Sequence, residues 1–410
     1  MTAPVRDTAT LVGDAVERNG SDEIASADAL LQRMLRDCVT ADASDLHVAP
    51  GLAPFMRIHG ILEAQDKYGV LSSQVTQALG EVLSRGFDRG SLNTTGSIDG
   101  ALTAQDGTRF RFNVFRRQGS ISIALRRLEE RFRTLADLGL PDSLYDLCAQ
   151  PDGLVVVAGP TGAGKSTTLA TLIDRINQTR RAHIVTIEDP IEYLHRSSKS
   201  LVNQRQVGLD AGSFNDALVA SLRQDPDVIL VGEIRDLATI RTAITAAETG
   251  HLVFTTVHAG DCVGTIERLV SVFPADEQNG IRRQLSLVLR CIIAQHLLVA
   301  DGEQGILPAA ADGTVRRRRI VVSEVLTATD AVSHLIAAGK SAQIYSSMES
   351  GGNQGMQTLE ESLANLWTGG WISEQTATNM ARNPAVVRDR AQRMPVRASA
   401  QAARPQGVTR

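Results

Sequence analysis

The sequence has few cysteines, few aromatic residues and no long apolar run. Its four cysteines lie far apart and form no C-x-x-C pair, so neither a zinc ribbon nor a disulfide framework is expected, and a reducing compartment fits. No stretch approaches the roughly 18 uninterrupted apolar residues of a membrane-spanning helix. The polar start, residues 1–26, does not have the form of a secretory signal. These absences predict a soluble, cytoplasmic protein.

The charge distribution argues against a nucleic-acid motor. The net charge is −4 and aromatic residues make up 4% of the chain, so a global positive field is missing and stacking platforms for bases are few. Two basic stretches stand out: the run RRRR at 316–319, and residues 382–410, with seven arginines and one aspartate. We interpret the first as a solvated hairpin and the second as a mobile tail, and we expect no nucleic-acid partner.

Two patterns of secondary structure divide the chain. After a flexible segment over residues 1–26, residues 27–133 alternate short strands with isolated helices, which is typical of a small α+β domain. Helical spacing predicts helices over 27–40 and 71–85. Polar–apolar alternation around a turn at 116–119 predicts a hairpin of strands 110–115 and 120–125. Two further strands are predicted at 45–48 and 55–58.

A linker over residues 134–152 leads into a different pattern. Apolar strands now alternate with amphipathic helices, which predicts an α/β domain over 153–380 with a mostly parallel sheet and helices on both faces. A flexible basic tail is expected over 381–410. The predicted strands are 154–158, 184–187, 228–231, 252–256 and 320–325, the last in a late hairpin; the predicted helical regions are 165–178, 213–224, 237–249, 261–298 and 328–379.

A phosphate-binding loop follows the first of these strands. Residues 154–166, LVVVAGPTGAGKS, contain G-x-x-x-x-G-K-[ST] between an apolar strand and a helix. The glycines let backbone amides surround phosphate oxygens, and the helix adds the positive end of its dipole. Lys165 supplies charge to the β- and γ-phosphates, and the Ser166 hydroxyl can bind Mg²⁺. ATP and Mg²⁺ are the predicted cofactors, and the predicted nucleotide-binding residues are Gly159, Pro160, Thr161, Gly162, Ala163, Gly164, Lys165, Ser166 and Thr167.

Hydrolysis also needs a group that orients or deprotonates the attacking water, and two acidic segments follow strands. In IVTIEDPIE (184–192), Glu188 lies just past a strand. In DPDVILVGEIRD (225–236), Gly232 occupies the position of the magnesium-binding aspartate of most P-loop enzymes, and Glu233 follows it. We predict that Glu233 is the general base and that Glu188 shares in binding the metal or polarising water. The competing interpretation of each acid is a cap of the next helix.

Two histidines bracket the next strand, in GHLVFTTVHAG. His258 follows the strand, at the sheet edge that carries the other candidates. We predict that it senses the γ-phosphate. His251 precedes the strand, and its role stays open between structure and function. Thr255 and Thr256 are interpreted as strand residues.

At this point the sequence resembles the secretion ATPases of type II secretion and type IV pilus machines, over residues 27–380. Four signatures occur in order: GPTGAGKST, TIEDPIEY, DPDVILVGEIRD and TGHLVFTTVH. Within the group it is most similar to the PilT-like pilus retraction ATPases. The assembly motors of this superfamily usually have a tetracysteine zinc element, which is missing here. The similarity to retraction ATPases is carried by ASDLHVAPGLAPFMRIHG at 43–60, RFRFNVF at 109–115, LADLGLP at 135–141 and QIYSSMESGGNQGMQTLEESL at 343–363.

The resemblance implies a PAS-like N-terminal domain, a RecA-like P-loop domain and a homo-hexameric ring. It also implies a platform protein of the inner membrane as partner and peripheral association with the inner face of that membrane. An arginine from a neighbouring domain is expected to stabilise the transition state. The matching positions are Arg111 and Arg126, with Arg109 and Arg127 as near alternatives.

The predicted function is an ATP-hydrolysing hexameric motor for type IV pilus retraction and twitching motility. An assembly or secretion motor of the same superfamily is the alternative. A ring that binds ATP without turnover is a third interpretation, which both intact carboxylates disfavour.

One segment departs from the family pattern. Retraction motors commonly read A-I-R-N-L-I-R in the late helical region, a segment associated with coupling hydrolysis to movement. This sequence reads AVSHLIAAG at 331–339, so Ser333 replaces the first arginine, His334 replaces the asparagine, and the second arginine is lost. We expect ATP turnover to be retained despite this change, whereas the kind of mechanical work that the motor performs is left open.

Overall fold

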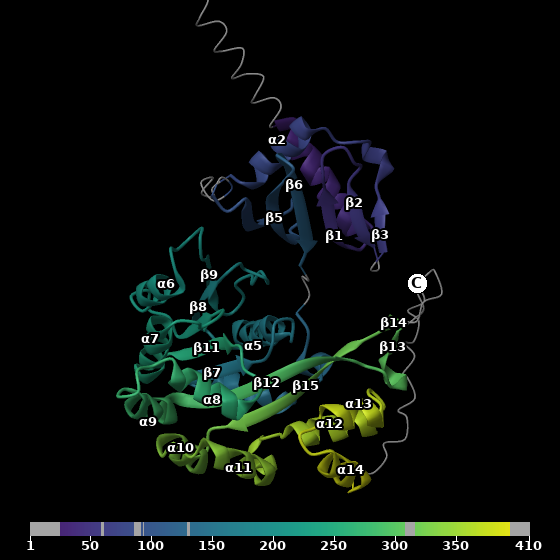
Figure 1. Ribbon diagram of the computed structural model, residues 1–410. Coiled ribbons are helices and arrows are strands. Elements are labelled where there is room, and N and C mark those ends of the chain that lie inside the picture. The colour runs from purple at the N-terminus through teal and green to yellow at the C-terminus, as the bar shows by residue number, and fades with distance from the viewer. Residues whose placement is uncertain are drawn as a thin grey trace, which may run out of the picture. The chain divides into compact units, whose positions relative to one another are not determined.

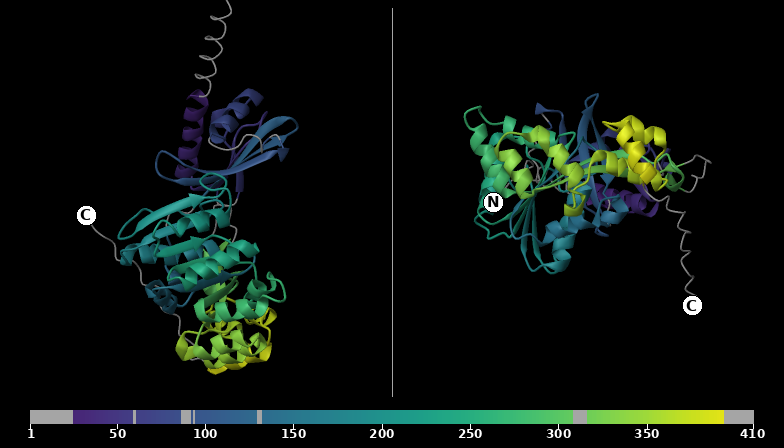
Figure 2. Two further views of the ribbon diagram at one scale, coloured as in Figure 1. Left: turned by 90° about the vertical axis from the view of Figure 1, so that its left-hand side faces the viewer. Right: turned by 90° about the horizontal axis from the view of Figure 1, so that it is seen from below.

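The computed structural model describes residues 25–58, 61–85, 92, 94–128, 132–307 and 316–393. The chain forms two compact units (Figures 1 and 2). The first contains the residues up to Arg131 together with Glu188–Arg196 and Gln204–Ser213, and the second contains the rest. Most of the predicted flexible start, residues 1–24, lies outside the described residues. In the described part of the chain, no helix is both long and apolar enough to cross a bilayer.

The first unit is built on a six-stranded antiparallel sheet. Its elements are a helix over residues 25–40, β1 (Ala43–Val48), β2 (Phe55–Ile58), β3 (Ile61–Ala64), η1 (Asp66–Tyr68), α2 (Ser73–Leu83), β4 (Ser97–Thr103), β5 (Arg109–Arg117) and β6 (Ser120–Arg127). The strands lie in the order β3-β2-β1-β6-β5-β4. Leu35 of the first helix and Leu79 of α2 share one apolar core with Phe110 and Phe112 of β5. Both predicted helices and the four predicted strands are present.

The β5–β6 hairpin follows directly from the sequence pattern. In β5, buried Phe110 and Phe112 alternate with more exposed residues. Gln118 and Gly119 have φ values of 51° and 79°, the positive values that a two-residue hairpin turn of this kind requires. The predicted hairpin is confirmed. The pattern does not reveal β3, because all four of its residues are exposed and it shows no alternation.

The second unit contains a seven-stranded sheet. Its strands are β7 (Gly153–Ala158), β8 (His183–Glu188), β9 (Leu201–Gln206), β10 (Val228–Val231), β11 (Leu252–Val257), β12 (Leu289–Val299) and β15 (Arg319–Thr327). They lie in the order β15-β12-β7-β11-β10-β8-β9, with β12, β7, β11, β10 and β8 parallel and β15 antiparallel to β12. Every residue of β7 and β11 is buried, as a parallel sheet covered on both faces requires.

Helices cover this sheet, and further helices follow its last strand toward the C-terminus. They are α4 (Leu135–Leu138), η2 (Asp142–Ala149), α5 (Lys165–Thr179), α6 (Phe214–Ser221), α7 (Leu237–Glu248), α8 (Cys262–Ser271), α9 (Gln278–Val288), η3 (Glu303–Gly305), α10 (Asp330–Ala337), η4 (Ser341–Gln343), α11 (Ile344–Ser350), η5 (Gly352–Gln354), α12 (Leu359–Thr368), α13 (Glu374–Met380) and α14 (Pro384–Arg393). The last three helices lie together beside β15 (Figures 1 and 2).

The prediction of helix over 261–298 is wrong for its last part, which forms β12. The sequence LRCIIAQHLLV is apolar at most positions, and such a run fits a buried strand as well as a buried helix. Pairing with β7 on one side and β15 on the other decides for the strand. This strand also brings a residue to the phosphate loop, described below.

Two segments predicted to be flexible or connecting are folded. In the predicted linker 134–152, Leu135 and Leu144 are buried in the core of the second unit. In the predicted tail from 381, α14 buries Val387 fully against α12, so the prediction of flexibility is wrong for residues 384–393. The apolar stretch of this helix is short, and the segment around it is basic and rich in alanine, so composition alone does not predict the helix. Residues 394–410 lie outside the described residues.

The arginine run 316–319 lies at the start of the last strand. Arg316 and Arg317 form β14, which pairs antiparallel with β13 (Ile306–Leu307), so the predicted late hairpin is confirmed. Arg318 and Arg319 are exposed, as expected of a solvated hairpin. Residues 308–315 between the strands are outside the described part.

All four cysteines are unpaired and buried. Burial raises the pKa of Cys38 to about 11 and the pKa values of Cys148 and Cys291 to about 12. For Cys262 burial also raises the pKa well above its usual value. These thiols therefore act as small apolar core residues, since the reactive thiolate is scarce at neutral pH.

Candidate active site

The phosphate loop connects β7, near the middle of the sheet, to the first turn of α5. Gly164 caps the helix with a φ of 89°, which favours glycine. A Cβ on Gly159 would lie 2.3 Å from the carbonyl oxygen of Gln295, so a side chain does not fit there. The predicted residues 159–167 thus form one compact turn at the start of a helix, where backbone amides and the helix dipole favour a phosphate.

Lys165 is held within this loop. Its Nζ donates to the carbonyl oxygens of Gly159 at 2.9 Å and Pro160 at 3.1 Å. Ser166 follows it on the first turn of α5 and is exposed. The ammonium group therefore lies over the loop that is expected to surround the phosphates, and the serine hydroxyl is open to a ligand.

Gln295 is a residue of this site that the sequence does not reveal. It is fully buried on β12, its Nε2 donates to the carbonyl oxygen of Ala163 at 2.7 Å, and its Oε1 accepts from Thr168 Oγ1 at 3.0 Å. One amide thus ties the loop to the helix that follows it. The only sequence signal is a glutamine inside an apolar strand, and a buried amide of this kind must find partners.

Glu233 and His258 meet at the carboxyl ends of neighbouring strands. Glu233 lies two residues after β10 and His258 directly after β11; Nε2 of the histidine is 3.1 Å from Oε1 of the glutamate. Thr256 fixes this arrangement, because its Oγ1 donates to the carbonyl oxygen of Gly232 at 2.6 Å. The sheet edge therefore brings the predicted base and the predicted sensor into contact, in the same unit as the phosphate loop.

Arg235 controls the charge of Glu233. Burial by itself would raise the pKa of Glu233, but the hydrogen bond from Arg235 at 2.6 Å and the charges of Arg235, His258 and Lys165 lower it below its usual range. Glu233 is therefore a carboxylate at neutral pH. An ionised carboxylate accepts hydrogen bonds, as a residue that orients or deprotonates water must.

We expect Arg235→Ala to move the acidic limb of the kcat/KM profile to higher pH. The substitution removes the hydrogen bond and the charge that do most to lower the pKa of Glu233 and leaves the burial that raises it, so the carboxylate is protonated at a higher pH. Phosphate release measured across the acidic range tests this. Arg393→Ala, which removes an arginine from an exposed pair with Asp389, is the matched control. An unmoved acidic limb in Arg235→Ala would contradict the assignment.

Comparison with known proteins assigns this chain to a family. A family model described as "Type II/IV secretion system protein" matches residues 21–370. The chain belongs to this family. The type IV pilus retraction ATPase PilT of Pseudomonas aeruginosa is 40% identical over 83% of this chain and 95% of its own. The twitching motility protein of Neisseria gonorrhoeae is 39% identical over 80% of this chain and 84% of its own.

This chain has the same fold as the pilus retraction motor PilT in its crystal structure with bound ADP. The TM-score is 0.77 at 39% identity, over 87% of this chain and 98% of that one. The predicted family, the α/β fold class with a RecA-like P-loop domain, and the ATPase class are confirmed. Binding of an adenine nucleotide is supported by the ADP in that structure.

His251, which precedes β11, contacts the end of a helix and has a structural role. His251 Nδ1 donates to the carbonyl oxygen of Ala246 at 2.9 Å, and Thr249 Oγ1 lies 3.3 Å from the same nitrogen. The ring thus adds to the cap at the C-terminal end of α7, where the same carbonyl group also accepts from the backbone nitrogens of Thr249 and His251. Thr255 is buried within β11, in agreement with its interpretation as a strand residue.

The two arginines implied by the family resemblance lie in the first unit. Arg111 and Arg126 face each other across the β5–β6 pair, and both are exposed. Nε of Arg126 donates to Oδ1 of the buried Asp45 at 2.9 Å, while Arg111 lies 4.0 Å from Glu192. A catalytic role for either arginine stays a prediction.

Glu188 and the alternative arginines also belong to the first unit. Glu188 ends β8, and its Oε1 accepts from Gln204 Nε2 at 3.1 Å. Burial lowers the pKa of Arg109, against the opposing charges of Glu188 and Asp210. Arg127 is paired with Asp42. These contacts describe where the residues lie, and their catalytic roles stay predictions.

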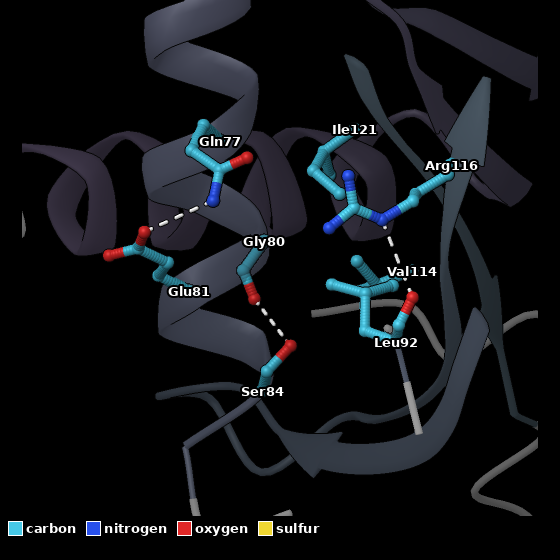
Figure 3. A pocket seen from close by; sticks show the side chains of 8 residues that line it. All are labelled: Gln77, Gly80, Glu81, Ser84, Leu92, Val114, Arg116 and Ile121. Carbon is cyan, nitrogen blue, oxygen red and sulfur yellow. Dashed lines mark hydrogen bonds between the residues drawn. The ribbon is translucent and has the colours of Figure 1, made fainter. Parts of the chain in front are cut away.

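The first unit also contains a pocket of about 150 Å³ between α2 and the β5–β6 hairpin (Figure 3). Gly80 lets the helix approach the sheet there, since a Cβ would lie 2.8 Å from Cγ2 of Ile121. Predicted nucleotide-binding or catalytic residues do not line it. The lining residues are Gln77, Gly80, Glu81, Ser84, Leu92, Val114, Arg116 and Ile121.

Proposed function

We propose that this protein is an ATP-hydrolysing motor that powers retraction of a type IV pilus. The observation that carries the proposal is the Glu233–His258 pair, 3.1 Å apart, at the sheet edge of a unit that also holds a complete phosphate loop. The 40% identity to PilT over most of both chains supports retraction as the output.

The residues act in sequence on ATP. The loop amides and Lys165 hold the phosphates and offset their negative charge. Glu233, as a carboxylate, orients the attacking water and accepts its proton. His258, already in contact with Glu233, contacts the γ-phosphate and so reports whether ATP or ADP is bound. Cleavage gives ADP and phosphate, and loss of the γ-phosphate removes one partner of His258.

The residues at the loop fit Mg²⁺. The Ser166 hydroxyl is exposed on the first turn of α5, and Mg²⁺ in nucleotide sites commonly takes one or two protein oxygens and completes its shell with phosphates and water. When bound, Mg²⁺ neutralises charge on the β- and γ-phosphates. We assign Ser166 as a direct ligand, and Glu188 as the acid that shares in binding the metal or its water.

The assembly is part of the same proposal. The chain forms a homo-hexamer that works against a platform protein at the inner face of the cytoplasmic membrane, with Arg111 and Arg126 serving a neighbouring nucleotide. The PAS-like domain is assigned to residues 27–133 and the RecA-like domain to 153–380. Support comes from the family match and from the resemblance to hexameric motors. In a closed ring, hydrolysis at one site can rotate rigid parts against each other.

The altered segment 331–339 forms α10 and the turn after it. Val332 and Ile336 are fully buried, so the helix keeps its packing, whereas His334 is exposed and Ser333 is half-buried. The substitutions therefore alter the surface of α10 without altering its core. This favours intact ATP turnover and leaves the alternative open: an assembly or secretion motor, in line with the family's description as type II/IV secretion.

We expect deletion of the gene to leave cells with more surface pili. A retraction motor removes pili, so its loss accumulates them; loss of an assembly motor leaves none, and loss of a secretion motor leaves pilus number unchanged. Counts of surface pili by electron microscopy distinguish these results. Complementation with the wild-type chain should restore the count and Lys165→Ala should not. Absence of pili, or an unchanged count, would contradict the retraction proposal.

A further inference from the structure

The loop that carries His258 is anchored at three of its four residues. It runs from the end of β11 to the start of α8, and His258 contacts Glu233 at its first residue. Gly260 accepts a hydrogen bond from Nε2 of His296 on β12 at 2.9 Å. Asp261 caps α8 by accepting from the backbone nitrogen of Gly264 at 2.6 Å. The loop therefore has few ways to place His258.

Arg382, which lies between α13 and α14, reaches the far end of this loop. Its Nη2 is 3.1 Å from Oδ2 of Asp261 and 2.7 Å from Oε1 of Glu324. Glu324 is 3% exposed on β15, and its other oxygen accepts from the backbone nitrogen of Cys262 at 3.1 Å. One guanidinium thus joins the carboxylate of Asp261, the last residue of the loop, to the carboxylate that holds the first residue of α8.

The C-terminal helices hold Arg382 from the other side. Its guanidinium carbon lies 4.8 Å from the ring centroid of Tyr345 on α11. The Tyr345 hydroxyl is hydrogen-bonded to buried Glu360 on α12, which also accepts from the backbone nitrogen of Asn383 at 3.2 Å. A guanidinium that stacks on an aromatic ring and binds carboxylates at its edge has a restricted orientation.

We propose that Arg382 is a positioning residue for ATP hydrolysis, which sets the loop from His258 to Asp261 against Glu233. The inference rests on the proposed role of His258 as sensor of the γ-phosphate. Arg382 acts through Asp261 and not on the reacting groups themselves. It fixes Asp261, three residues from His258, to β15 and to the helices α11 and α12.

A residue that only stabilises the fold would have a different effect when it is replaced. Loss of a stabilising residue lowers the stability of the whole second unit, and ADP binding and turnover then fall together. Loss of a positioning residue spares ADP binding, because the phosphate loop is held by β12 through Gln295, and it affects the step that needs the γ-phosphate. The separation of these two quantities is therefore the decisive measurement.

The test uses the full-length protein with Arg382→Ala, Arg382→Lys and Asp261→Asn. We expect Arg382→Ala to lower kcat about tenfold, the lower end of the loss caused by removing a residue that orients a metal ligand, with the Kd for ADP changed less than about twofold. Arg382→Lys should recover part of kcat, because it keeps the charge. Asp261→Asn, which keeps a good helix cap but loses the ion pair, should lower kcat in the same direction without a folding defect.

Arg388→Ala is the matched control, since Arg388 pairs with exposed Glu374 in the same helical region and does not reach the loop. It should match the wild type. A wild-type kcat in Arg382→Ala and Asp261→Asn overturns the inference, and so does a parallel loss of ADP affinity. If Glu233→Gln strongly lowers kcat while Arg382→Ala keeps the wild-type kcat, only this inference fails. If Glu233→Gln retains turnover, the proposed function of the site fails.

Discussion

Replacing Glu233 with glutamine should lower kcat for ATP hydrolysis by about 10²–10⁴-fold, the range for loss of a general base. Glutamine has the same shape but cannot accept the proton of the attacking water. The affinity for ADP should change little, because the phosphate loop is held by contacts with Gln295 and within the loop itself. Phosphate release and ADP binding by the purified variant measure the two quantities.

The control for Glu233→Gln is Glu374→Gln, which removes a carboxylate from an exposed pair on α13. Its turnover should equal that of the wild type. Lys165→Ala should abolish release through loss of phosphate binding. Wild-type turnover in both Lys165→Ala and Glu233→Gln would show that hydrolysis takes place elsewhere. A wild-type protein that binds ATP but releases no phosphate would instead favour the non-hydrolysing ring.

Gly159→Ala should reduce ADP affinity about tenfold to 100-fold, which corresponds to about 1.4–2.8 kcal/mol of lost binding free energy. The new Cβ would lie 2.3 Å from the carbonyl oxygen of Gln295, whereas an ordinary contact begins near 3.4 Å. Either the loop or β12 must move. Overpacking of this kind also destabilises a folded unit by about 1–3 kcal/mol. Isothermal titration with ADP and a thermal melt measure both effects.

Gly162→Ala is the matched control for this glycine. It lies in the same loop and has a φ of 78°, and a Cβ added there would meet no atom of the described residues within 4 Å. In the ligand-free protein its cost is limited to the left-handed backbone, about 1–2 kcal/mol. A loss of ADP affinity in Gly162→Ala as large as in Gly159→Ala would show that backbone strain, and not the collision with β12, decides binding.

The sequence predicts the parts of the site that depend on short segments. The loop around Lys165, and Glu233 and His258 at strand ends, each follow from a motif and its neighbouring strand. Their positions after strands put both residues at one edge of the sheet, and the pairing of β10 with β11 in the structure brings them into contact. Local patterns are sufficient here, since each residue is placed by the strand that directly precedes it.

The missed residues depend on contacts between distant segments. Gln295 bonds to Ala163, 132 residues away in sequence, from a strand that periodicity cannot distinguish from a helix. Arg235 is two residues from Glu233, yet only side-chain geometry shows that it lowers the pKa of that acid. Arg382 lies in a basic, alanine-rich segment whose composition resembles a tail. Composition and periodicity carry no information on such pairings.

The burial of all four cysteines has a practical consequence for measuring motion in this protein. Maleimide dyes react with thiolates, and Cys38, with a pKa of about 11, and Cys148, with a pKa of about 12, hold almost none near neutral pH. A single cysteine introduced on the surface should therefore be labelled selectively in the otherwise native chain. Two such labelled positions form a fluorescent pair that can follow each turnover, and the four buried cysteines need not be replaced.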